Sequence, residues 1–176
     1  SLAWDHITVS TVGRTAGLAR LAARRQHRAN LAISLHAADA AVRSALVPPA
    51  RLEPVAGIRR ALLDLVPALP RGRRYMVSEV VIPGVTDTEE NLSGIFNFMR
   101  DVGLNSVALL PYNASAGAKY EWLGLTYEVQ GEPQGRARLE GLRKFGIVGE
   151  VRGKGMLRGV ELVAECRAGK RIAKRA

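Results

Sequence analysis

The chain has 176 residues, which suits one domain with a hydrophobic core, and its 47% hydrophobic and 24% charged residues are typical of a globular protein. It has no apolar run near the roughly 18 residues of a membrane-spanning helix, and its single cysteine, Cys166, excludes an internal disulfide and favours a reducing, cytoplasmic setting with no membrane partner. The net charge of +10, from 26 Lys and Arg against 16 Asp and Glu, favours a polyanionic partner such as nucleic acid.

The first half of the chain alternates strand-like and helix-like segments. Residues 6–10 alternate like a short strand, and the Ala-, Leu- and Arg-rich residues 15–28 follow as a helix. The apolar run 30–35 predicts a buried strand, after which Asp39 is a good N-cap for a short helix. Another helix is expected over residues 55–65, where apolar residues recur at helical spacing before two prolines.

The second half continues this order. Residues 74–82 predict a strand, and Thr88 caps a helix that carries acidic residues in its first turn and stops at Val102-Gly103. Residues 106–110 predict the next strand. The remaining expected elements are a Gly-rich loop to Gln134, a helix through Lys144 and a last strand over residues 147–151.

This alternation of five strands with helices predicts an α/β fold. We expect the strands to be parallel neighbours in one curved sheet, with helices on its outer face. The pattern is that of a partial parallel (β/α) barrel, in which ligand sites lie at the carboxyl ends of the strands. Residues 1–152 are expected to form this partial barrel, and residues 153–176 a basic carboxyl-terminal tail.

Polar residues gather just beyond several predicted strand ends. A parallel barrel would bring them around one mouth, where hydroxyl, imidazole and amide groups could hold a polar small molecule. The alternative is that they only satisfy backbone groups of the loops. We find no metal constellation, because the three histidines have no useful spacing. The residues at the strand ends are Ser10 with Thr11, Ser34 with His36, the Pro83-Gly84 loop, and Asn113.

Four segments resemble one family. ITVSTVG, LAISLHAADAAVRSALVP, VIPGVTDTEEN and LLPYN look like the carboxyl-terminal half of radical-SAM enzymes, with the pattern of the methyltransferases that act at carbon 2 or carbon 8 of an adenosine in 23S rRNA. The SLHA segment with the following D-x-x-x-R-x-x-L-V-P is the most specific signal. The resemblance covers about Ile7 to Asn113 and implies rRNA as the partner. It also implies that S-adenosylmethionine is contacted by Ser10, Ser34, Leu35, His36 and Asn113.

The same resemblance implies a catalytic role for Cys166. The family carries a methyl-bearing cysteine seven residues after the glycine of an Arg-Gly pair, and Arg158-Gly159 with Cys166 keep that spacing. Cys166 would then accept a methyl group and present it to the adenine carbon. The family's Gly-Gln-Leu after the cysteine is replaced by Arg-Ala-Gly, and the alternative is an inert thiol.

The family's cluster motif C-x-x-x-C-x-x-C, which lies upstream of ITVSTVG in relatives, is absent from this chain. One cysteine cannot bind the 4Fe-4S cluster that cleaves S-adenosylmethionine in the intact family. We therefore expect a radical-SAM barrel truncated at its amino-terminal side and inactive alone.

Two other functions stay open. VIPGVTDTEENL with LLPYNASAGAKYEWLGLTYEVQG also resembles glycyl-radical-enzyme activases, whose substrate is a protein glycine, and VRGKGMLRGVELV resembles part of class III aminotransferases. The basic charge, on the other hand, favours a non-catalytic RNA-binding domain. Salt-dependent rRNA binding without S-adenosylmethionine binding would indicate that last function.

Overall fold

The computed structural model describes residues 3–24, 29–47, 53–70, 73–112, 117–124, 126, 141–144, 148–154 and 157–162. Its strands are β1 (Thr8–Thr11), β2 (Asn30–Ser34), β3 (Tyr75–Val81), β4 (Ser106–Pro111), β5 (Val148–Lys154) and β6 (Leu157–Leu162). Its α-helices are α1 (Thr15–Ala23), α2 (Ala40–Leu46), α3 (Val55–Leu65), α4 (Glu89–Asp101) and α5 (Gly117–Trp122), and its 3-10 turns are η1 (Trp4–His6), η3 (Val66–Ala68) and η5 (Gly141–Lys144).

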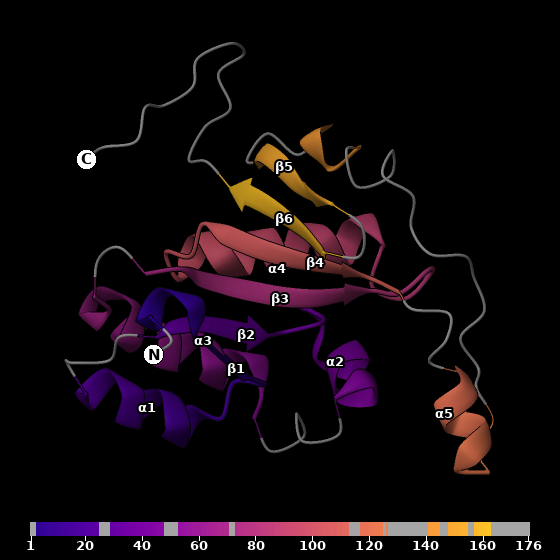
Figure 1. The fold of residues 1–176 in the computed structure, drawn as a ribbon, viewed down its shortest axis with the longest axis horizontal. Coiled ribbons are helices and arrows are strands. Elements are labelled where there is room, and N and C mark those ends of the chain that lie inside the picture. Colours follow the sequence, from indigo (N-terminus) through magenta and orange to yellow (C-terminus); the bar gives the residue numbers. More distant parts are fainter. Residues whose placement is uncertain are drawn as a thin grey trace.

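The strands form one sheet of six, in the order β1-β2-β3-β4-β6-β5 (Figure 1). The first four are parallel neighbours, which confirms the predicted α/β class and the partial parallel (β/α) barrel. The prediction for the last strand is wrong in one respect. β5 covers the expected residues but does not neighbour β4, because β6 lies between them and is antiparallel to both.

β6 escaped prediction because its sequence, LRGVEL, stands among the basic residues that we assigned to the tail. A short alternating strand next to charged residues gives only a weak signal in the sequence. β6 pairs locally with β5, but neither strand was recognised as part of a hairpin. The division at residue 152 stays a prediction, although β5 and β6 place residues up to 162 in the sheet. Residues 163–176 lie outside the described part.

Helices cover one face of the sheet, and several described side chains on the other face are only half-buried. Side chains alternate across a strand, so the register places Ile33, Val77 and Leu109 on one face, where they are buried against α1, α3 and α4. In Figure 1, α3 and α4 lie behind the strands. The neighbouring positions Val80 and Leu110, on the other face, are only half-buried. The buried core also contains Leu18, Leu31, Leu35, Ile58, Leu62, Leu65, Val81, Leu92, Ile95, Phe96, Phe98, Met99, Val102, Leu104 and Val107.

The helix ends follow the predicted signals. The Asp39 carboxylate accepts from the N–H groups of Ala41 and Val42 at 2.9 Å, which confirms it as the N-cap of α2. The Thr88 hydroxyl accepts from Asn91 N–H at 3.2 Å at the start of α4. After α4, Gly103 has φ +75°, a left-handed conformation that favours glycine and ends the helix.

Two other expectations differ from the structure. The Gly-rich segment expected as a loop contains α5, and of the helix expected up to Lys144 the structure describes only η5. Residues 127–140 lie outside the described part. None of the described helices is long and apolar enough to cross a membrane.

Candidate ligand site at the carboxyl ends of the strands

Serines from neighbouring strands share the face of the sheet that lies opposite α1, α3 and α4. The hydroxyls of Ser10 on β1 and Ser34 on β2 lie 3.3 Å apart and share a hydrogen bond. Ser34 is paired in register with Ser78 on β3, so all three serines lie on the same face. Two predicted contacts, Ser10 and Ser34, are therefore brought together, and Ser78 adds a hydroxyl that we did not predict.

His36 lies at the carboxyl end of β2, next to these serines. It has φ +63°, which is uncommon for a residue with a side chain and turns the chain sharply after β2. Its Nδ1 accepts a hydrogen bond from Val80 N–H at 3.3 Å, so the imidazole leans toward β3. Burial, and then the positive charge of Arg43, lower the pKa of His36. The ring is therefore neutral at neutral pH and carries its proton on Nε2.

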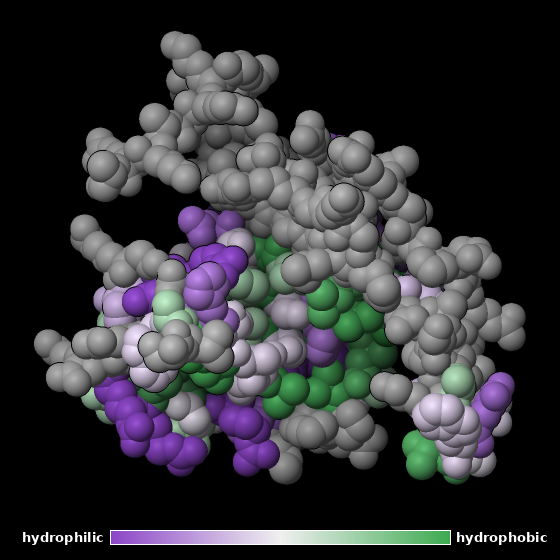
Figure 2. Space-filling model, viewed as in Figure 1, coloured by the Kyte–Doolittle hydropathy of each residue, from purple (hydrophilic) through white to green (hydrophobic). Residues whose placement is uncertain are grey.

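That Nε2–H group is a donor available to a ligand. Within the described part of the chain it has no hydrogen-bond partner, and the side chain of His36 is half-buried. Figure 2 shows hydrophobic side chains on this side of the molecule around a hydrophilic patch. Hydroxyls, one imidazole donor and half-buried apolar side chains such as Val80 and Leu110 on the same face suit a small molecule with both polar and apolar parts.

Leu35 anchors the site. Its side chain is 0% exposed and belongs to the core. Its N–H donates to Ser78 C=O at 3.1 Å and its carbonyl accepts from Arg43 Nε at 3.1 Å. Its predicted contact with S-adenosylmethionine stays a prediction, while these bonds fix the backbone that precedes His36.

Three other side chains near the strand ends, those of Thr11, Thr86 and Asp87, bond to backbone groups of their own loops. The Thr11 hydroxyl accepts from Gly13 N–H at 3.2 Å. In the loop after β3, the Asp87 carboxylate accepts from Gly84 N–H, and the Thr86 hydroxyl both donates to Val80 C=O and accepts from Ile82 N–H. For these groups the structure favours the alternative that they satisfy loop backbone.

Asn113 and Cys166 lie outside the described residues. The roles that the resemblance implies for them therefore stay predictions.

A buried amide joins the His36 loop to the next loop. Asn91 of α4 accepts from Ala38 N–H at 2.9 Å through Oδ1, and its Nδ2 donates to Thr86 C=O at 2.9 Å and to Glu79 Oε1 at 3.0 Å. A longer contact of 3.5 Å reaches His36 C=O. Asn91 therefore holds the loops after β2 and β3 together.

Glu79 supports this amide from the helix-covered face of the sheet. It is 0% exposed, and its Oε2 has no hydrogen-bond partner among the described residues. Burial, opposed by the Asn91 hydrogen bond and assisted by the charge of Asp87, raises the pKa of Glu79 to about 9. The carboxyl is therefore protonated at neutral pH, which avoids the cost of an isolated buried charge.

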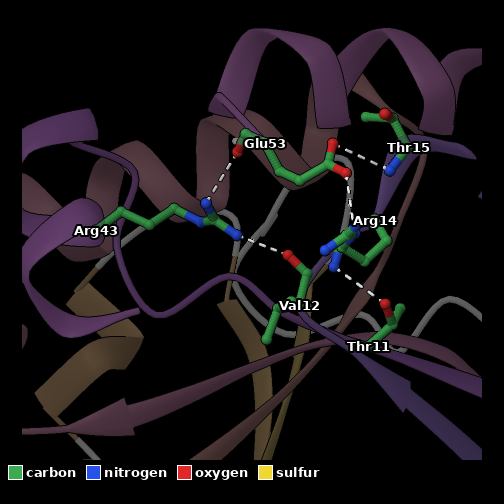
Figure 3. Close-up of polar contacts among 7 residues, drawn as sticks. Thr11, Val12, Arg14, Thr15, Arg43 and Glu53 are labelled. Atoms are coloured by element: carbon green, nitrogen blue, oxygen red, sulfur yellow. Dashed lines mark hydrogen bonds and ion pairs between the residues drawn. The ribbon is translucent and has the colours of Figure 1, made fainter. Parts of the chain in front are cut away.

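A second polar cluster ties the neighbouring loops (Figure 3). The buried guanidinium of Arg43 donates to three backbone carbonyls, and the Glu53 carboxylate accepts from Thr15 N–H at 3.1 Å and pairs with Arg14 Nε at 3.2 Å. The hydrogen bonds with Thr15, together with the nearby arginines and against a burial effect, lower the pKa of Glu53. We did not predict Glu79, Asn91, Arg43 or Glu53 as parts of the site, although Arg43 stands in the D-x-x-x-R-x-x-L-V-P motif and Asn91 in VIPGVTDTEEN.

Comparisons with known proteins agree with the family that the motifs resemble, although no family model matches. A probable dual-specificity RNA methyltransferase RlmN of Opitutus terrae is 34% identical over 173 residues, which cover 94% of this chain and 44% of that protein. A probable dual-specificity RNA methyltransferase RlmN of Roseiflexus is 34% identical over 175 residues, covering 91% of this chain and 39% of that protein. The ribosomal RNA large subunit methyltransferase Cfr of Clostridium botulinum is 30% identical over 118 residues, covering 65% and 33%.

A solved structure agrees with these relatives. The crystal structure of a radical SAM methyltransferase from Sphaerobacter thermophilus matches with a TM-score of 0.64 and 29% identity over 81% of this chain and 38% of that one. The partial barrel is thus of the radical-SAM type. The chain spans less than half the length of the relatives named here. It belongs to the radical-SAM RNA methyltransferase family and corresponds to part of the longer proteins in it.

Proposed function

We propose that this chain supplies the S-adenosylmethionine-binding strand ends of a methyltransferase that modifies an adenosine of large-subunit ribosomal RNA. The observation that carries the proposal is the meeting of Ser10, Ser34 and a neutral His36 at one edge of the sheet. Asn113 is proposed as a further contact to the same ligand. The RNA partner is supported by the net charge of +10 and by the names of the relatives.

The donor set fits the nucleoside part of S-adenosylmethionine. Serine hydroxyls donate and accept, so they suit ribose hydroxyls, whereas the Nε2–H of a neutral histidine suits an acceptor nitrogen or oxygen. An iron–sulfur cluster does not fit the residues of this chain, because the whole sequence has one cysteine and the described residues hold no group of three or more His, Cys, Asp or Glu side chains placed for a metal. We therefore assign ligand binding, and no cluster-dependent step, to this chain.

Isothermal titration calorimetry with S-adenosylmethionine tests the site. We expect the parent chain to bind and His36→Asn to bind about tenfold more weakly, which is the loss of one hydrogen bond of about 1.4 kcal/mol. Asparagine is the chosen replacement because it tolerates the left-handed backbone of His36. The matched control is His6→Asn in η1, away from the strand ends, which should keep the parent affinity.

Two outcomes would contradict the proposal. Equal affinity of the parent and His36→Asn would place the ligand elsewhere. A parent chain that does not bind S-adenosylmethionine but binds rRNA in a salt-dependent way would instead indicate the non-catalytic RNA-binding domain.

We further propose that Cys166 accepts a methyl group and holds it for the adenine carbon, while the transfer to that carbon is a cluster-dependent step that we do not assign to this chain alone. Because the chain has one cysteine, a thiol reagent reports on this residue alone. We expect saturating S-adenosylmethionine to slow the labelling of Cys166, since a cysteine held at the site would be shielded by the ligand. The His36→Asn variant should need more ligand for the same protection. A labelling rate that ligand does not change would show that Cys166 is not held there.

A further inference from the structure

Arg43 occupies a position that is unusual for a charged side chain. It lies on α2 and is 1% exposed, which makes it one of the largest fully buried side chains in the described part of the chain. Burial lowers the pKa of this group and the nearby Glu53 carboxylate raises it. A guanidinium nevertheless keeps its proton in proteins. A buried cation is costly unless its donors are satisfied, so its bonding partners show what holds it there.

All three nitrogens of the guanidinium donate to backbone carbonyls of different loops. Nε donates to Leu35 at 3.1 Å, Nη1 to Glu53 at 3.0 Å and Nη2 to Val12 at 2.6 Å. Figure 3 shows the side chain reaching between the Glu53 and Val12 carbonyls. The planar fork of arginine spans such acceptors at once, which the single ammonium of lysine cannot do.

Two of the three carbonyls belong to the loops that carry the candidate site. Val12 follows Ser10 by two residues in the loop after β1, and Leu35 directly precedes His36. Glu53 stands before α3, and its carboxylate holds Thr15 at the start of α1. One side chain therefore fixes the backbone on both sides of the Ser10–Ser34 hydroxyl pair.

We propose that Arg43 is a positioning residue for the S-adenosylmethionine site, which it serves by holding the loops after β1 and β2 so that Ser10, Ser34 and His36 stay in one arrangement. This inference rests on the proposed function. Replacing Arg43 by a hydrophobic residue would leave three carbonyls unpaired, so the loops would separate or rotate.

The charge of Arg43 has a second effect, which acts on His36. It lowers the pKa of His36, after the larger effect of burial. The neutral ring can then keep Nδ1 as the acceptor of Val80 N–H and leave Nε2–H for the ligand. The guanidinium thus acts on His36 both through the backbone of Leu35 and through its charge.

The test combines ligand affinity with NMR of the His36 ring in Arg43→Met and Arg43→Lys. We expect both variants to bind S-adenosylmethionine at least about tenfold more weakly, the lower end of the range found when a residue that orients a ligand-contacting side chain is removed. In Arg43→Met the pKa of His36 should rise, because the positive charge is gone. The nitrogen chemical shift of Nδ1 should also move away from the value of a ring nitrogen that carries no proton and only accepts a hydrogen bond. Arg43→Lys should also bind S-adenosylmethionine more weakly, but the pKa of His36 should rise less than in Arg43→Met, because the positive charge remains.

A merely structural role would reduce the unfolding midpoint but leave the ligand affinity and the tautomer of His36 in the folded protein unchanged. Parent-like values of affinity, pKa and tautomer in both variants would overturn the inference. If Arg43→Met does not fold, Arg43→Lys decides on affinity and tautomer alone. The control is Arg59→Met on α3, whose guanidinium pairs with Asp101 on the surface and should change neither readout.

A failure of the proposed function can be distinguished from a failure of this inference about Arg43. A parent chain that does not bind S-adenosylmethionine would overturn the function, and the His36 pKa and tautomer would still test whether Arg43 positions that residue.

Discussion

The Glu79→Gln variant is expected to gain stability relative to the parent as the pH rises. The pKa of Glu79 is about 9 in the folded chain, against an ordinary value of 4.5. Between these values the folded state holds a proton that the unfolded state has lost, so the contribution of Glu79 to the free energy of unfolding falls with rising pH. The slope is about 1.4 kcal/mol per pH unit. From pH 6 to pH 8 the difference between Glu79→Gln and the parent should shift by about 3 kcal/mol in favour of the variant.

Urea unfolding at several pH values measures this difference directly. Subtracting the two proteins removes the pH dependence of all other groups. Glutamine keeps an oxygen that can accept from Asn91 Nδ2 and cannot ionise. The control is Glu90→Gln, which changes an exposed carboxyl of α4 and should keep the slope of the parent. A difference between Glu79→Gln and the parent that stays flat from pH 6 to pH 8 would show that Glu79 does not hold this proton.

Much of the sheet could be predicted because its signals are local. The continuous apolar run of β2 marks a strand buried in a parallel sheet, and Asp39 and Thr88 mark helix starts within a residue. β6 could not be predicted in this way, since its short sequence lies among charged residues and its place beside β4 depends on contacts between parts of the chain that are distant in sequence. The strand β6, which we did not predict, changes the neighbour of β4 but not the class of the fold.

The candidate site was predictable only in its exposed and half-buried parts. Ser10 and Ser34 lie at the carboxyl ends of β1 and β2 and His36 follows β2, and a parallel sheet places such residues together. The residues that hold this edge in place are buried polar groups, and burial of a charged or amide side chain is set by the tertiary fold. Motifs in the sequence contain Arg43 and Asn91, but the part that these side chains play in holding the loops is seen only once their carbonyl and loop partners are known.

Gly94→Ala is expected to displace the His36 loop even though alanine is the better helix former. Gly94 lies one turn after Asn91 on α4, and a Cβ at this position would stand 2.7 Å from Ala38 Cβ. Two carbon atoms without a bond between them normally approach to about 3.5–4.0 Å. Helix propensity favours alanine by about 1 kcal/mol, while overpacking costs about 1–3 kcal/mol, so we expect a net loss of about 1 kcal/mol. The loop must also shift by roughly 1 Å to restore contact distance, which should weaken S-adenosylmethionine binding at least about tenfold.

A double-mutant cycle with Ala38→Gly isolates this contact. Removing the Ala38 methyl makes room for the new one, so the Gly94→Ala/Ala38→Gly protein should bind S-adenosylmethionine more tightly than Gly94→Ala alone, with a positive coupling of about 1 kcal/mol. Gly17→Ala on α1 is the matched control, because its added Cβ meets only Arg14 Cβ at 3.8 Å. That variant should gain stability from helix propensity and keep the parent affinity. If the double variant binds no better than Gly94→Ala, the approach of α4 to Ala38 is not what holds the His36 loop, and the hydrogen bonds of Asn91 and Arg43 do so instead.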